Sequence, residues 1–217
     1  MNLDFWVDPI CPWCWVTARW VVESVAPERD LTITWQPISL LIKNQIPKDS
    51  DRYEPNRFTH SLLRVMESVR AASGDDAVFP LYWELGRRIH HERDRSFDPA
   101  DALAAAGLNS SHAAAFDDPA WDAEIGRRMD IGLELAGSDI GTPIIAFDDA
   151  AGNRVGIFGP VITRIPPKET SLRLWDAVVT LTTTPGFWEL KRTRTERPEF
   201  GPAPIPHVFG DDGTKRS

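Results

Sequence analysis

The sequence lacks long hydrophobic runs, has only two cysteines and carries no excess of basic residues. No apolar stretch approaches the roughly 18 residues of a membrane-spanning helix, so a transmembrane protein is not expected. The 24 lysines and arginines are outnumbered by 32 aspartates and glutamates, which gives a net charge of −8. This balance argues against a nucleic-acid partner, whose binding rests on phosphate neutralisation, and more weakly against docking on an anionic membrane.

Signals for export and for nucleotide cofactors are also missing. Residues 1–7 do not form a basic region followed by an apolar stretch, as a secretory leader would, so we expect a cytoplasmic protein. Two cysteines are too few for a disulfide-built secreted scaffold. No glycine-rich dinucleotide turn or phosphate loop occurs, and no bound flavin or nicotinamide is expected.

The order of local patterns indicates an α/β protein. Apolar residues alternate with polar ones from 3 to 7, which predicts a strand, and they recur at helical spacing from 16 to 25. Residues 31–38 are rich in β-branched and aromatic types and predict a second strand. Strand, helix and strand in this order predict a βαβ unit. Two further strand signals between 142 and 158 flank a turn and predict a hairpin, and a final helix is expected over 168–183.

The middle of the chain is interpreted as a helical insertion. From about 45 to 138 apolar residues recur at helical spacing, over a length too great for a loop. We therefore predict one domain over residues 1–197 that contains this inserted subdomain. Residues 198–217 include four prolines and little apolar periodicity, which predicts a Pro-rich flexible tail.

The most informative motif is Cys11-Pro12-Trp13-Cys14, which lies between the first expected strand and helix. A C-x-x-C pair near a βαβ pattern is typical of thioredoxin-like redox sites. At the N-terminal end of the helix the Cys11 thiolate would be stabilised by unpaired amides and by the helix dipole, making Cys11 the attacking sulfur. Cys14, one turn deeper, would resolve the mixed disulfide.

Chance spacing, a pair of core cysteines and half of a zinc site are the alternatives for this motif. A structural zinc ion needs two further ligands at suitable spacing, and His60, His90 and His91 are far along the chain, so no metal site is expected. The adjacent residues His90-His91-Glu92 would point about 100° apart on a helix and would not converge on one ion. A solvated surface is the favoured interpretation of that cluster.

A second motif, Gly141-Thr142-Pro143, opens one of the later strands. Proline cannot donate to a strand ladder, so its position there needs a reason. A cis peptide bond would lay the Thr142 backbone beside the dithiol, free to pair with an extended substrate. The alternative is an ordinary trans proline at a strand edge.

Taken with the helical insertion, these motifs resemble the DsbA-like branch of the thioredoxin superfamily, and most closely its actinobacterial mycothiol-dependent nitroreductase family. C-x-x-C and Thr-Pro are shared across the superfamily, whereas the run Leu-Lys-Arg-Thr-Arg-Thr at 190–195 is more specific. The resemblance covers nearly the whole chain and is carried by residues 5–15, 88–90, 140–143, 158–161, 164–166, 174–176 and 189–196.

The resemblance implies a thioredoxin-like fold with a large helical insertion, and a cytosolic thiol oxidoreductase that uses mycothiol as its thiol reductant without a bound cofactor. Its acceptor would be a nitroaromatic or other small molecule, or a protein disulfide. Cys11 would be the nucleophile, Cys14 the resolving thiol and Thr142-Pro143 the cis-proline contact. By the family match alone, His90 would be a substrate-site residue that tunes the thiolate or donates a proton.

Aromatic and basic residues add three expectations. Trp6 and Trp20 should belong to the core, because aromatic residues dominate core burial. Trp13, between the cysteines, should face outward and contact the substrate. The basic run from Lys191 to Arg197 is interpreted as the solvated end of the last helix, where cations suit the dipole, and it receives no binding role.

The main alternative function is a FrnE-like protein-disulfide oxidoreductase or isomerase, since an open Thr-Pro strand edge would admit a peptide. A kappa-type glutathione transferase would share the fold but typically carries a serine where this chain has Cys11. A non-catalytic thioredoxin-like module would have an unreactive Cys11. The sequence does not decide between a monomer and a homodimer.

Overall fold

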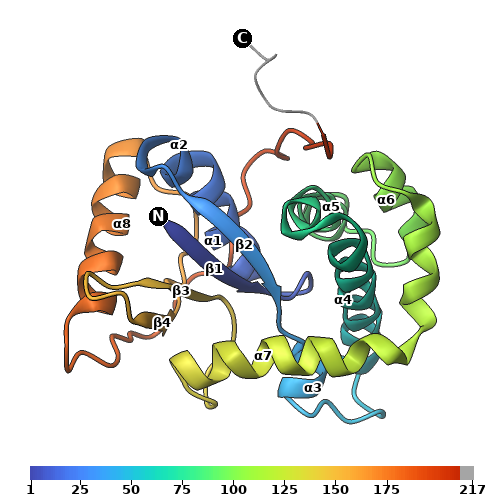
Figure 1. The fold of residues 1–217 in the computed structure, drawn as a ribbon, viewed down its shortest axis with the longest axis horizontal. Coiled ribbons are helices and arrows are strands. Elements are labelled where there is room, and N and C mark those ends of the chain that lie inside the picture. The colour runs from blue at the N-terminus through green and yellow to red at the C-terminus, as the bar shows by residue number, and fades with distance from the viewer. Residues whose placement is uncertain (211–217) are drawn as a thin grey trace. The chain divides into compact units, whose positions relative to one another are not determined.

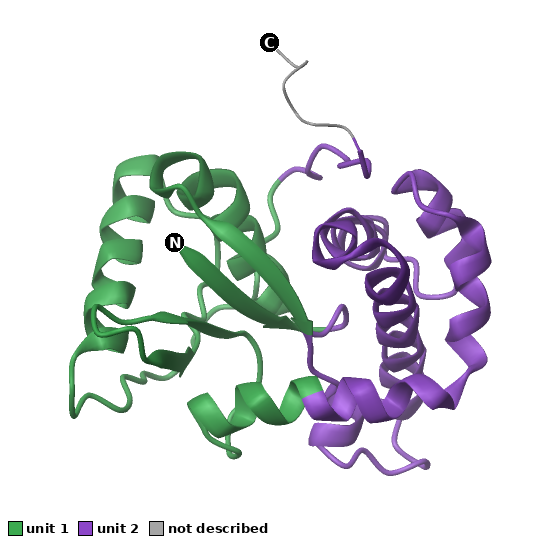
Figure 2. Ribbon diagram, in the orientation of Figure 1, with its two compact units in different colours: residues 1–7, 11–36, 128–201 green, residues 8–10, 37–127, 202–217 purple. Residues whose placement is uncertain are grey.

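The computed structural model describes residues 1–210, and the last part of the expected tail, 211–217, lies outside the described residues. The chain divides into two compact units, which Figure 2 shows in green and purple. Unit 1 comprises residues 1–7, 11–36 and 128–201, and unit 2 comprises residues 8–10, 37–127 and 202–217. The predicted insertion at about 45–138 and the predicted tail from 198 have different boundaries from these units, and they stay predictions.

Unit 1 contains the sheet and the helices next to it (Figure 1). Its elements are β1 (Asn2–Val7), α1 (Pro12–Trp20), a π-helical turn (Val21–Val25), α2 (Ala26–Arg29), β2 (Thr32–Pro37, whose last residue belongs to unit 2), the C-terminal part of α7 (Asp122–Ala136), β3 (Ile144–Asp148), β4 (Arg154–Phe158) and α8 (Lys168–Thr183). The helix expected over 16–25 thus changes type at Val21. Pro27 lacks the N–H that an unbroken α-helix would need, which accounts for the change.

The strands form one sheet in the order β2-β1-β3-β4. β3 pairs antiparallel with β1, with Phe5 opposite Ile145, and antiparallel with β4, with Ile145 opposite Ile157. Figure 1 draws β1 and β2 as arrows that run in the same direction, as a strand-helix-strand unit requires. The predicted βαβ unit and the predicted β3–β4 hairpin are confirmed.

One face of the sheet packs against α1 and α8 through aromatic side chains. The ring of Trp175 on α8 lies 6.0 Å from Trp20 on α1 and 6.3 Å from Phe147 on β3. Phe5 and Trp35 stack 5.1 Å apart across β1 and β2. All five residues are buried, so this aromatic cluster is the core of the layer, and the assignment of Trp20 to the core is confirmed.

The opposite face packs against the C-terminal part of α7. Trp6 is buried there, as predicted, and its Nε1–H donates to the Arg128 carbonyl of α7 at 2.8 Å. Two glycines allow the close approach: a Cβ on Gly132 would lie 2.7 Å from the Trp6 ring, and one on Gly156 of β4 would lie 2.9 Å from Leu135. Helices on both faces of a mixed sheet give unit 1 a three-layer α/β/α architecture.

Apart from Pro37, the last residue of β2, the regular elements of unit 2 within residues 1–210 are helical. Its elements are α3 (Leu40–Lys43), α4 (Tyr53–Ser73), a 3₁₀ turn (Asp75–Ala77), α5 (Val78–Arg87), a π-helical turn (Arg88–Glu92), α6 (Pro99–Ala105), two 3₁₀ segments (Ser110–Asp117 and Pro119–Trp121) and the N-terminal part of α7. The apolar residues Leu62, Val65, Met66 and Val69 of α4 are buried, and α6 ends before Gly107, whose positive φ of 71° suits a helix end. No helix among residues 1–210 has the length and apolarity that a bilayer crossing would demand.

The chain returns to unit 2 after residue 201 and runs along α5 and α6 without regular structure. Trp83 Nε1–H donates to the Ile205 carbonyl at 3.0 Å, and the Phe209 amide donates to the Ala106 carbonyl at 2.8 Å. The His207 ring lies 4.8 Å from that of Phe79. Residues 202–210 therefore make specific contacts within unit 2.

Candidate active site

The dithiol lies at the start of α1, in unit 1, and both cysteines are thiols. Cys11 is the N-cap: its backbone is extended (φ −76°, ψ 110°), and its Sγ accepts a hydrogen bond from the Cys14 amide at 3.4 Å. Pro12 follows in the first helical turn, where its missing N–H costs nothing. An amide and the positive end of the helix therefore both face the Cys11 sulfur, an arrangement that stabilises a thiolate.

Cys14 has a different environment from Cys11. Its side chain is fully buried, and its Sγ–H donates to the Trp6 carbonyl of β1 at 3.7 Å. The Cys11 Sγ–H also donates to a carbonyl, that of Thr142 at 3.8 Å, so donation to a carbonyl does not separate the two sulfurs. The difference is that Cys11 in addition accepts the Cys14 N–H at the start of α1, and such a bond favours the anion.

The Thr142-Pro143 peptide bond is cis, as predicted, and the Thr142 carbonyl lies 3.8 Å from the Cys11 Sγ. Thr142 is buried, and its hydroxyl has no hydrogen-bond partner within residues 1–210. The Pro143 carbonyl accepts from the Gly159 amide at 2.8 Å. This contact anchors the cis-proline segment to the residues that follow β4.

A second cis proline, Pro160, follows in this region and was not predicted. Its carbonyl accepts a hydrogen bond from the Thr17 hydroxyl of α1 at 2.8 Å. The helix that begins at the dithiol is therefore tied to the segment that holds Pro143. The Gly159-Pro160 dipeptide was visible in the sequence, but its partner Thr17 is too distant along the chain to be inferred from spacing.

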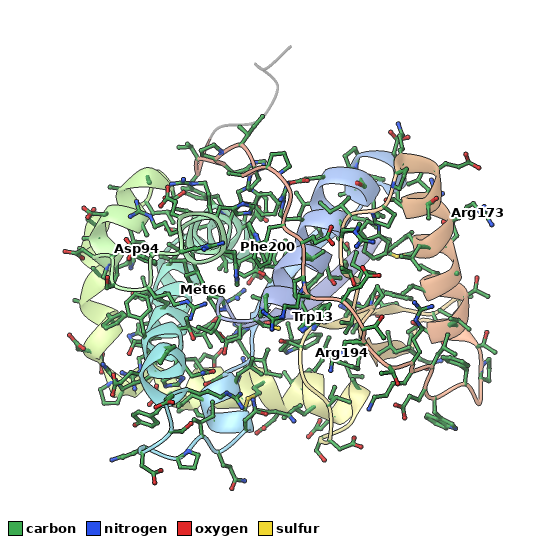
Figure 3. All side chains as sticks on the ribbon, turned by 180° about the vertical axis from the view of Figure 1, so that it is seen from behind. Trp13, Met66, Asp94, Arg173, Arg194 and Phe200 are labelled. Atoms are coloured by element: carbon green, nitrogen blue, oxygen red, sulfur yellow. The ribbon has the colours of Figure 1, made fainter. Side chains whose placement is uncertain are left out.

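Trp13, between the two cysteines, is partly exposed, and the guanidinium carbon of Arg194 lies 5.2 Å from its ring centroid. Figure 3 shows the two labelled side chains next to each other. This contact corrects the assignment of the basic run to the end of the last helix. α8 ends at Thr183, before Pro185 and Gly186, so Arg194 lies in an irregular segment and is brought back to the dithiol.

His90 lies in unit 2, on the π-helical turn, and it is buried. The solvated-surface interpretation is therefore wrong for this residue. Its Nε2–H donates to the Pro9 carbonyl at 2.9 Å, and burial lowers the pKa of His90 to about 3. A neutral ring is poorly suited to donate a proton as imidazolium, and its substrate role stays a prediction. What the hydrogen bond does is hold the backbone two residues before Cys11.

Asp8 is a buried carboxyl that the sequence patterns did not single out as a site residue. It accepts hydrogen bonds from the amides of Leu40 at 2.7 Å and Ile10 at 3.0 Å, and also from the Thr59 hydroxyl. Burial outweighs these bonds and raises the pKa of Asp8 to about 6. Asp8 and His90 thus anchor the segment 8–10, which precedes Cys11, within unit 2.

Metal-ligand types do not gather around this site. Within residues 1–210, no group of three or more histidine, cysteine, aspartate or glutamate side chains is arranged to hold a metal ion. The chemistry that the described residues can supply is that of the two sulfurs, a helix N-terminus, the carbonyl before the cis proline, and the Trp13–Arg194 pair.

A family model described as Rv2466c-like, mycothiol-dependent nitroreductase Rv2466c, matches residues 10–192. The chain belongs to this family. The match contains Cys11, Cys14, Thr142 and Pro143, and it ends two residues before Arg194. Membership places the chain among oxidoreductases, and it confirms the family predicted from the sequence.

Relatives and solved structures agree with this family fold. The chain is 27% identical to the uncharacterized protein Rv2286c of Mycobacterium tuberculosis, over 89% of this chain and 83% of that protein. Among solved structures it is similar to the cytosolic disulfide reductase DsbM of Pseudomonas aeruginosa, with 13% identity and a TM-score of 0.56, over 83% of this chain and all of that one. It is equally similar, by TM-score, to SCO1869 of Streptomyces coelicolor, described as a probable DsbA oxidoreductase, with 16% identity over 90% and 94% of the two chains. These likenesses confirm the DsbA-like thioredoxin fold.

Proposed function

We propose that the chain is a dithiol oxidoreductase that reduces nitroaromatic or other small acceptors, and that mycothiol then reduces its disulfide back to the dithiol. One observation carries the proposal, the placement of the Cys11 side chain. Cys11 caps α1, its Sγ accepts a hydrogen bond from the Cys14 amide, and the same Sγ lies 3.8 Å from the Thr142 carbonyl oxygen that precedes the cis proline. This arrangement favours a nucleophilic thiolate with a second thiol one helical turn away. The family's description supports mycothiol as the reductant and a nitro compound as the acceptor.

The proposed reaction balances through the two sulfurs. Cys11 and Cys14 would be oxidised to a disulfide, and the two electrons and two protons released would convert a nitro group into a nitroso group and water. Two mycothiol molecules would then reduce the disulfide and leave as mycothiol disulfide. No resident cofactor is required by this cycle.

Each site residue has a role in this proposal. Cys11 attacks and Cys14 resolves, while the Trp13 ring contacts a flat acceptor. The Thr142-Pro143 segment borders the attacking sulfur and offers backbone groups to the bound molecule. His90 acts by holding the Pro9 carbonyl and thereby the chain that leads into Cys11.

A FrnE-like protein-disulfide oxidoreductase or isomerase is the second candidate. The observation in its favour is the Thr142 backbone beside Cys11, with which an extended peptide bound at the dithiol would pair in this proposal. The DsbM neighbour, itself a cytosolic disulfide reductase, is compatible with either candidate. A cytoplasmic location belongs to both proposals, since mycothiol and protein thiols are maintained in a reducing compartment.

The deciding experiment is turnover of a nitroaromatic with a mycothiol-regenerating system. Turnover should vanish in Cys11→Ser and should fail when glutathione replaces mycothiol. When it is treated with mycothiol disulfide in the absence of the regenerating system, Cys14→Ser should accumulate a mixed disulfide between Cys11 and one mycothiol, while the second mycothiol leaves as its thiolate. The mixed disulfide is visible as an added mass on the intact protein. No nitroaromatic turnover, together with rapid reduction of disulfide-bonded insulin, would move the assignment to the second candidate.

A further inference from the structure

The segment that follows α8 concentrates unpaired positive charge in an acidic protein. Lys191, Arg192, Arg194 and Arg197 are all exposed, and none has a carboxylate within ion-pair distance in the part of the chain that the structure describes. Two acidic residues nearby, Glu196 and Glu199, both pair with Arg164. The charge of the four cations is therefore not neutralised by an ion pair within the described residues.

One of these cations lies at the dithiol. The Arg194 guanidinium carbon lies over the ring of Trp13, 5.2 Å from its centroid, and Trp13 is flanked by Pro12 and Cys14 in the Cys-Pro-Trp-Cys motif (Figure 3). A guanidinium is a planar fork of N–H donors and has no acceptor. Such a fork matches two oxygens on one atom, as in a carboxylate.

We propose that Arg194 is a specificity-determining residue of the dithiol site, which selects acceptors carrying an anionic carboxylate beside an aromatic ring. The ring would lie against Trp13 and the paired oxygens against the guanidinium. The family match ends at residue 192, so this contact is supplied by a part of the chain that the family model does not cover. The acceptor class rests on the proposed function, whereas the charge preference can be measured without any acceptor.

That measurement is the alkylation of Cys11 by iodoacetate and by iodoacetamide at low ionic strength. Both reagents attack the same thiolate, so the ratio of their rates cancels any change in thiolate fraction and reports attraction of an anion to the site. Arg194→Gln should lower the iodoacetate-to-iodoacetamide ratio about 3- to 5-fold, the size expected for an exposed ion pair. About 1 M salt should remove the difference between Arg194→Gln and the wild type.

Arg192→Gln is the matched control, because it removes the same charge from a residue that does not stack on Trp13 in the structure. Its rate ratio should stay close to the wild-type value, and Arg194→Lys should restore only part of the preference because lysine cannot stack as a planar fork. With purified enzyme, Arg194→Gln should raise the KM for 4-nitrobenzoate about 3- to 5-fold and change that for neutral 4-nitrobenzyl alcohol less than 2-fold.

If Cys11 reacts but the rate ratio is equal in the wild type, Arg194→Gln and Arg192→Gln, the role proposed for Arg194 is overturned and the proposed function is not. Equal loss in Arg194→Gln and Arg192→Gln would show a diffuse charge effect and would also overturn the stacked recognition. Failure of both reagents to alkylate wild-type Cys11 would overturn the proposed function and this inference with it.

Discussion

Replacing Gly132 with alanine should destabilise the protein relative to the same change at Gly126, although both glycines lie on α7. A Cβ on Gly132 would come within 2.7 Å of Cε2 and 2.8 Å of Nε1 of Trp6, well inside contact distance. The ring cannot simply move away, because it is buried and its Nε1–H is bonded to the Arg128 carbonyl of the same helix at 2.8 Å. The added methyl group therefore acts against the contact between α7 and the sheet.

Two opposing effects set the magnitude. Alanine in place of glycine inside a helix favours the folded state by about 1 kcal/mol, whereas overpacking a buried contact costs about 1–3 kcal/mol. A Cβ on Gly126 would meet no described atom within 4 Å, so only the first effect applies there. The helix-propensity contribution cancels between the variants, and Gly126→Ala should exceed Gly132→Ala in free energy of unfolding by about 1–3 kcal/mol.

Urea unfolding followed by far-UV circular dichroism measures this difference, with both variants compared with the wild type in one buffer. The slope against urea concentration should be unchanged, so that midpoints can be compared directly. Equal changes in the two variants would refute the argument, because they would mean that Trp6 yields to a methyl group without loss of packing.

Two further predictions concern buried polar groups near the dithiol. Because burial raises the pKa of Asp8 from 3.8 to about 6, the folded state holds this proton more tightly than the unfolded chain. Wild-type stability relative to Asp8→Asn should therefore fall as the pH rises from about 4 to 7, by up to about 3 kcal/mol, and a pH-independent difference in urea titrations would contradict this. Thr142→Val removes a buried hydroxyl that has no partner within residues 1–210, so it should raise the free energy of unfolding by roughly 1 kcal/mol. A lower unfolding midpoint for Thr142→Val would show that the hydroxyl is satisfied in solution.

Local patterns were sufficient to predict the elements and the position of the dithiol. The alternation in β1, the hairpin of β3 and β4 and the bounds of α8 are confirmed, because each depends on residues that are neighbours in sequence. The N-cap role of Cys11 follows from the same kind of signal, a strand end followed by Pro12 and a helical repeat. The cis bond before Pro143 was predictable only because the dithiol suggested what the proline would face.

Contacts between distant residues could not be predicted in this way. His90 was assigned to a solvated surface because adjacent residues of a helix point apart and do not converge on one ion. Its partner, the Pro9 carbonyl, lies 81 positions earlier, too far for a local pattern to indicate. Arg194 was assigned to a helix end although Pro185 and Gly186 had already marked the stop, and nothing in the spacing indicates that it reaches Trp13. Burial of a polar side chain depends on which segments meet, and a single sequence does not contain that information.

The interleaving of the two units restricts how this protein can be recombined with its relatives. Residues 8–10 belong with 37–127, although they lie between β1 and Cys11 in the chain. A chimera that exchanged only the contiguous helical block would leave the Asp8 carboxyl facing a foreign Leu40 position and the Pro9 carbonyl facing a foreign His90 position. Exchange of the helical unit within this family therefore requires that residues 8–10 be exchanged together with 37–127, and the shorter segment begins three residues before Cys11.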